Sequence, residues 1–76
     1  MKTPIIATGP YDEQIRLVRW HKAEGSFIEI GDRICELESE AAAIDLVASE
    51  AGILRHLKRE GDPVRSGEWV ARVESE

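Results

Sequence analysis

The segment RWHKAEGSFIEIGDRICELESE, residues 19–40, recurs 36 positions later as RHLKREGDPVRSGEWVARVESE, residues 55–76. The two copies align without a gap. Eight of the 22 aligned positions are identical, namely Arg19/Arg55, Lys22/Lys58, Glu24/Glu60, Gly25/Gly61, Gly31/Gly67, Glu38/Glu74, Ser39/Ser75 and Glu40/Glu76. A duplicated unit of this length predicts two equivalent supersecondary structures that pack about a pseudo-twofold axis.

Each copy contains the same series of turns and strands. In the first copy a turn at Gly25 leads to a short strand, and a second turn at Gly31 leads to a longer one. In the longer strand, inward residues such as Cys35 and Leu37 alternate with glutamates, which is typical of a strand with one buried face. Because neither unit can bury that face alone, we predict an all-β fold. The expected form is a flattened barrel or sandwich of two pseudo-twofold-related four-stranded units.

One segment has a local preference that contradicts this prediction. Residues 36–51, ELESEAAAIDLVASEA, are rich in good helix formers. The repeat nevertheless favours a strand, since the first five of these residues match the end of the second copy. We therefore predict a strand over residues 33–38, a tight turn over 39–41 and a returning strand over 42–48, because context commonly overrides helix propensity.

Length and composition limit the possible functions. The chain has 76 residues, and we expect a single domain over residues 1–76. A net charge of −5 disfavours nucleic acid or an anionic membrane as a partner. One cysteine excludes an internal disulfide. No apolar run approaches the length of a membrane span, and the first residues lack a signal-peptide pattern, so we expect the cytoplasm or an organelle matrix.

The predicted turn carries a recognisable motif. Residues Glu38, Ser39, Glu40, Ala41 and Ala42 resemble the lipoyl-domain signature of Glu, Thr or Ser, Asp or Glu, Lys, Ala. The glycines at positions 25, 31 and 52 also have the spacing of that family. The related biotinyl carriers share the fold but have an Ala-Met-Lys-Met signature, whereas the single methionine here is Met1. The resemblance therefore favours the lipoyl branch, close to the lipoyl domains of 2-oxo acid dehydrogenase complexes.

This resemblance implies a carrier whose tip lysine forms an amide with lipoic acid. The implied protein partners are a lipoate ligase or lipoyl transferase, a 2-oxo acid decarboxylase and an acyltransferase core. Tethering the acyl group raises its local concentration at each partner. In this chain Ala41 occupies the attachment position and has no amine. The remaining lysines lie outside the signature, so we expect no lipoate cofactor unless residue 41 were lysine.

Two explanations for Ala41 remain open. It is either an engineered Lys→Ala change or the residue of a natural relative that lost its carrier chemistry. The first makes the chain a swinging-arm domain silenced at its attachment point. The second makes it a protein-interaction module without a cofactor. An independent enzyme is disfavoured, because no nucleophile and base occur at a catalytic spacing.

Acidic residues near the turn are further candidates. Glu36, Glu38, Glu40 and Asp45 either serve recognition by a ligase or partner enzyme or form a solvated strand face. Asp12 and Glu13 lie where the lipoyl family has a loop that helps partner enzymes choose their domain. A plain surface loop is the alternative for these two residues.

The other notable side chains have simpler interpretations. We expect Trp20 and Trp69 to be core or half-buried packing residues. Cys35 faces inward by alternation and is expected to be an inert buried thiol. His21 and His56 are isolated in the sequence, with no metal-binding spacing around them, so no metal site is predicted.

Overall fold

The computed structural model describes residues 1–8 and 14–75. Their elements are all strands, namely β1 (Lys2–Ile6), β2 (Ile15–Trp20), β3 (Phe27–Ile28), β4 (Arg33–Glu38), β5 (Ala43–Val47), β6 (Gly52–His56), β7 (Pro63–Val64) and β8 (Trp69–Glu74). The molecule is elongated, with extents of 36 × 19 × 18 Å. Within the described ranges, no helix is long and apolar enough to cross a bilayer.

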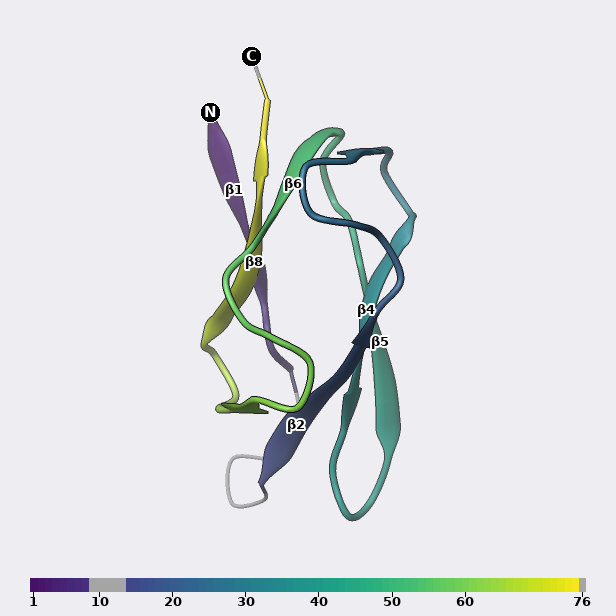
Figure 1. The fold of residues 1–76 in the computed structure, drawn as a ribbon, viewed down its shortest axis with the longest axis vertical. Helices are drawn as coiled ribbons and strands as arrows, with labels where there is room; N and C mark the ends of the chain where they lie inside the picture. Colours follow the sequence, from purple (N-terminus) through teal and green to yellow (C-terminus); the bar gives the residue numbers. More distant parts are fainter. Residues whose placement is uncertain (9–13, 76) are drawn as a thin grey trace.

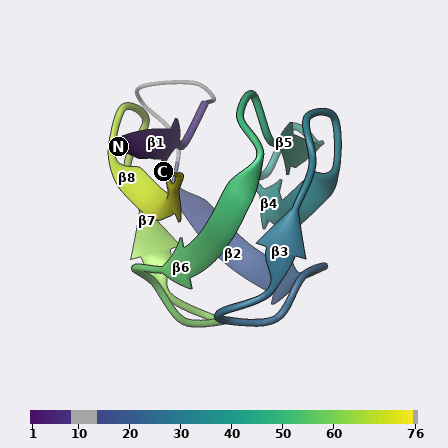
Figure 2. The same ribbon diagram turned by 90° about the horizontal axis from the view of Figure 1, so that it is seen from above.

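The strands form two antiparallel four-stranded sheets, as the repeat predicts. One sheet has the order β1-β8-β6-β3 and the other β5-β4-β2-β7. After a shift of 36 residues, β2, β3 and β4 correspond to β6, β7 and β8. Strand β5 occupies the same edge position in its sheet that β1 occupies in the other. Viewed along the long axis, β1 and β8 lie on one side and β4 and β5 on the other (Figure 2). The predicted pair of equivalent units is thus confirmed in the sheet order.

The Glu-Gly turns connect the two halves. Gly25 and Gly61 have φ values of 80° and 93°, a backbone conformation that glycine adopts without a steric penalty. The amide of Gly25 donates to the carbonyl of Leu54 at 2.8 Å, and the amide of Gly61 donates to the carbonyl of Leu17 at 2.7 Å. Each turn therefore binds a strand that belongs to the opposite copy.

Matching β-bulges occur in the equivalent strands β4 and β8. The pairing of β4 with β5 skips Ile34, and the pairing of β1 with β8 skips Val70, which is the equivalent residue of the second copy. Because of the extra residue, Ile34 and Cys35 are both buried although they are adjacent. After the bulge the predicted alternation holds as far as the turn.

The core lies between the sheets and is apolar throughout. Among the described residues no polar or charged residue is buried. Buried hydrophobic residues come from both copies and both sheets, namely Ile5, Ala7, Ile15, Leu17, Ile28, Ile34, Cys35, Leu37, Leu46, Ala48, Leu54, Val64, Val70, Ala71 and Val73. Burial of this kind stabilises a fold by roughly 25 cal/mol per Å² of apolar surface removed from water.

The segment with helix-forming composition is a β-hairpin. The predicted strand over residues 33–38 coincides with β4, whereas the returning strand is shorter than predicted and covers Ala43–Val47. Four residues, 39–42, connect the two strands. Leu46 is buried and its neighbours Asp45 and Val47 are exposed. A half-buried strand satisfies this pattern, so packing decides against the local helix preference.

Ion pairs on the surface join strands that are distant in sequence. Glu74 in β8 accepts hydrogen bonds from Arg72 at 2.9 Å and Arg55 at 3.2 Å, and these hold the pKa of its carboxyl below the ordinary value of 4.5. Lys58 donates to Glu68 at 2.8 Å and likewise lowers the pKa of that carboxyl. Glu74 and its two arginine partners thus link β6 to β8.

Because of these lowered pKa values, we expect acid to destabilise the fold. At pH values between the lowered pKa of the folded chain and the ordinary pKa of the unfolded chain, each carboxyl binds more protons in the unfolded chain than in the folded one. The free energy of unfolding therefore falls as the pH falls through this range. The loss should begin near pH 4.5 and continue below it. Urea unfolding from pH 7 down to pH 2.5 measures it. The variant E74Q should be less stable at neutral pH and show a flatter pH dependence; an unchanged slope would contradict the role of Glu74.

Candidate functional site

The candidate site is the turn between β4 and β5. It lies at one end of the molecule, opposite the two termini (Figure 1). The amide of Ser39 donates to the carbonyl of Ala42 at 2.8 Å and closes the loop. The hydroxyl oxygen of Ser39 accepts hydrogen bonds from the amides of Ala41 and Ala42, both at 3.3 Å. The serine side chain thus holds the turn in one shape, as serine commonly does in tight turns.

Ala41 is exposed in this turn, between exposed Glu40 and exposed Ala42. Its side chain is a methyl group that projects from a well-braced loop. A methyl group offers no nucleophile and no proton to exchange, so position 41 can form no amide with a carboxylic acid. The residues present therefore do not fit covalent attachment of lipoate or biotin at this turn.

A groove runs beside the turn. It has a volume of about 520 Å³ and is lined by Ser39 and Glu40 from the hairpin and by Arg16 and Pro63 from β2 and β7. Glu38 also reaches its edge, where an oxygen of its carboxylate lies 3.6 Å from Arg16. The groove brings residues of both copies next to the turn. Its charge is mixed, which suits a polar protein surface better than an apolar ligand.

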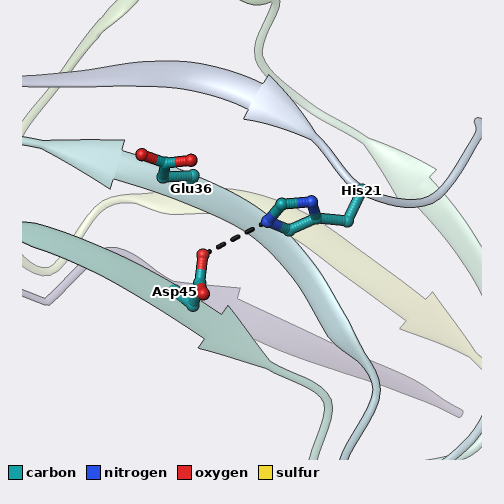
Figure 3. A group of neighbouring side chains, drawn as sticks. All are labelled: His21, Glu36 and Asp45. Atoms are coloured by element: carbon teal, nitrogen blue, oxygen red, sulfur yellow. Dashed lines mark hydrogen bonds and ion pairs between the residues drawn. The ribbon is translucent and has the colours of Figure 1, made fainter.

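Two of the predicted acidic residues lie away from the turn. Glu36 and Asp45 are directly paired across β4 and β5, two residue pairs below the end of the hairpin. His21 follows β2, and its Nε2 atom lies 3.2 Å from Oδ1 of Asp45 (Figure 3). His21, which has no metal-binding spacing around it in the sequence, therefore lies beside a carboxylate in the structure. Because β2, β4 and β5 are neighbours in one sheet, they bring together three residues that are far apart in sequence.

Comparison with known proteins identifies the family. Residues 1–73 match the biotin–lipoyl family, whose description is "Biotin-requiring enzyme". The chain belongs to the lipoyl/biotinyl carrier-domain family. The match covers nearly all of the chain, in agreement with the resemblance found at the turn.

Three relatives of this lipoyl/biotinyl domain are named as components of 2-oxoglutarate or pyruvate dehydrogenase. The domain is 34% identical over 58 residues to the dihydrolipoyllysine-residue succinyltransferase component of the 2-oxoglutarate dehydrogenase complex of Bacillus subtilis, and 36% identical over 58 residues to that of Staphylococcus saprophyticus. It is 35% identical over 54 residues to the mitochondrial pyruvate dehydrogenase protein X component of Mus musculus. These matches cover 75%, 75% and 71% of the chain, but only 14%, 14% and 11% of the relatives.

The tryptophans of this lipoyl/biotinyl domain differ in burial. Trp20 is half-buried, as expected, and its ring stacks on His56 with centroids 3.6 Å apart. Nε2 of His56 also lies 2.9 Å from the carbonyl oxygen of Lys22, so the second histidine is not isolated either. Trp69 is among the exposed hydrophobic residues at 47% exposure, so the expectation of a core position is wrong and only about half of its surface is covered. Trp69 begins β8 and pairs with Ile6 of β1, the edge strand of that sheet.

Cys35 is fully buried in the core of the domain, as the alternation predicts. Burial, with a smaller contribution from the charge of Asp45, raises the pKa of its thiol to about 12. A thiol with such a pKa remains protonated at neutral pH and is a poor nucleophile. The candidate partner-recognition residues Asp12 and Glu13 lie outside the residues that the structure describes.

Proposed function

We propose that this lipoyl/biotinyl domain is the carrier type of a 2-oxo acid dehydrogenase-like complex, silenced at its attachment turn by Ala41. The observation that carries this proposal is the braced, exposed turn in which the signature is complete at Glu38, Ser39, Glu40 and Ala42 but has a methyl group at the reactive position. The relatives named above support the choice of complex, since two are named as components of a 2-oxoglutarate dehydrogenase complex and the third as a pyruvate dehydrogenase component. The domain itself is proposed to be non-catalytic.

The same proposal covers partners and location. A lipoate ligase or lipoyl transferase, a 2-oxo acid decarboxylase and an acyltransferase core would meet the domain at the hairpin end, beside the groove at Arg16 and Glu38. We propose the whole chain, residues 1–76, as one such domain that works in the cytoplasm or an organelle matrix.

The alternative function is an interaction module that binds the same kind of partner without any cofactor. The exposed methyl group of Ala41 favours it, because the turn is shaped and supported although it has no chemistry to perform. In this case partner proteins would bind the turn and the groove as a rigid surface.

We expect the chain to remain unmodified by a lipoylating enzyme. Its three lysines are Lys2 in β1, Lys22 after β2 and Lys58 after β6, and none lies in the hairpin turn. The measurement is the intact mass after incubation with lipoate ligase, lipoate and ATP, with a lipoyl domain that has its lysine as the positive control. A mass gain of one lipoyl group on the chain would contradict the proposal.

A further inference from the structure

We propose that His21, Glu36 and Asp45 form a binding site for a divalent transition-metal ion, with Zn²⁺ as the best fit. Each residue supplies one ligand atom, and these atoms all lie within 4.8 Å of one another. They lie side by side on one sheet, in which β5, β4 and β2 are neighbours. His21 immediately follows β2, Glu36 is in the middle of β4 and Asp45 is in β5 (Figure 3). This metal site is separate from the attachment turn and does not depend on the proposed function.

The donor set matches the chemistry of zinc. Zinc binds imidazole nitrogen and carboxylate oxygen at about 2.0–2.2 Å, and sites with three protein ligands keep a fourth position for water. Glu36 and Asp45 are directly opposite each other across two antiparallel strands, where like charges repel. A divalent cation between the carboxylates would replace that repulsion with attraction. His21 already points its Nε2 atom at Asp45 and would need only a small shift to share an ion with it.

There is room for an ion and its water. A hollow of about 210 Å³ is lined by the three ligand residues together with Arg33 and Ile44. All three ligand side chains reach solvent, so an ion can enter without opening the core. The buried thiol of Cys35 is directed to the other face of β4 and does not compete for the metal.

Each of the two ligand carboxylates also forms an ion pair with an arginine. Nε of Arg19 lies 3.4 Å from Oε1 of Glu36, and a guanidinium nitrogen of Arg33 lies 3.5 Å from Oδ2 of Asp45. Both arginine side chains are more than half exposed, and such ion pairs contribute little to stability. The two arginines compete with a metal ion for the carboxylates and so weaken its binding. They do not block the site, because each arginine side chain can turn into solvent. Arg33 holds the carboxylate oxygen that does not face His21, so its removal should strengthen metal binding.

The duplicated half of the fold has no such site. The residues equivalent to His21 and Glu36 are Leu57 and Arg72. The position equivalent to Asp45 is Pro4, which is paired with Arg72 as Asp45 is paired with Glu36. The fold therefore forms without this set of ligands, and the set is a property of one face only. An ion bound there would join β2, β4 and β5 and so brace the hairpin that carries Ala41.

Isothermal titration calorimetry with zinc chloride tests this proposal on the whole chain. We expect one ion per chain, and binding weaker by more than about tenfold in H21A and in D45N. The variant R33Q should bind more tightly than the original chain. Zinc at ten times its dissociation constant should also raise the melting temperature by roughly 6–11 °C, because the ion binds only the folded state.

The control is H56A, which removes the other histidine and leaves the three ligands in place. It should bind zinc as the original chain does. Absence of binding at millimolar zinc would overturn the proposal. So would binding that H21A and D45N leave unchanged, or that H56A abolishes, because the ion would then be held elsewhere.

Discussion

Lysine at position 41 is expected to turn the chain from an inert substrate into one that a lipoate ligase modifies completely. The substitution A41K adds the missing amine at an exposed position, and no described residue has to move to accommodate it. The turn that presents the amine is already closed by the bond between Ser39 and Ala42 and by the hydroxyl of Ser39. The lysine amine and the turn that presents it would then be present together. Holding this amine in position against the activated lipoate can greatly increase the rate of amide formation.

The measurement is the intact mass after incubation with ligase, lipoate and ATP. The matched control is A43K, which places the same amine on exposed Ala43, the first residue of β5, outside the turn. We expect A41K to gain one lipoyl group and A43K to gain none. A modified A41K should further accept an acyl group from a 2-oxo acid decarboxylase if the chain is a carrier. An A41K chain that stays unmodified would favour the cofactor-free interaction module.

The substitution G52A is expected to cause the largest loss of stability of any glycine-to-alanine change among the described glycines. A Cβ atom at Gly52 would collide with the carbonyl oxygen of Glu74 and lie 2.9 Å from Cγ1 of Val73. Glu74 lies in the neighbouring strand β8 and pairs with Ile53 of β6, so its backbone cannot withdraw without breaking the sheet. Overpacking against backbone commonly costs 1–3 kcal/mol and here adds to the strain of a positive φ, so we expect a loss of about 3 kcal/mol or more.

A loss of this size is a large share of the total, since a domain of this length is stable by only about 4–11 kcal/mol. Urea unfolding measures it. The matched control is G61A, where a Cβ atom meets nothing within 4 Å and only the φ of 93° opposes the change. We expect that variant to lose about 1–2 kcal/mol. If G52A were no less stable than G61A, close approach of the backbone would not be the reason for glycine at position 52.

The repeat made most of the fold predictable. Glycines with positive φ recur at the turns of both copies, and the strand over residues 33–38 follows from the alternation of Cys35 and Leu37 with glutamates. Strand β1 has no counterpart in the aligned copies and contains Pro4, so the sequence gives little local sign of it. It is stabilised by pairing with β8, at the other end of the chain, and proline is tolerated because β1 is an edge strand.

The surroundings of His21 were harder to predict, although a signal existed. Once a hairpin is centred on residues 39–42, its register pairs Glu36 with Asp45. That pairing could have been derived from the sequence by counting outward from the turn. The position of His21 could not, because it depends on a bulge in β2 between Leu17 and Arg19 that shifts the end of the strand relative to β4. The exposure of Trp69 likewise depends on its place beside the edge strand.

The first and last described residues meet at the pole of the molecule farthest from the hairpin. The amino group of Met1 donates to the carbonyl of Ser75 at 2.7 Å, and the amide of Ser75 donates to the carbonyl of Met1 at 2.9 Å. Any polypeptide fused to either terminus would therefore leave on the side away from residue 41. A tether of that kind would leave the turn as the far end of the domain, where a partner can approach it without meeting the tether.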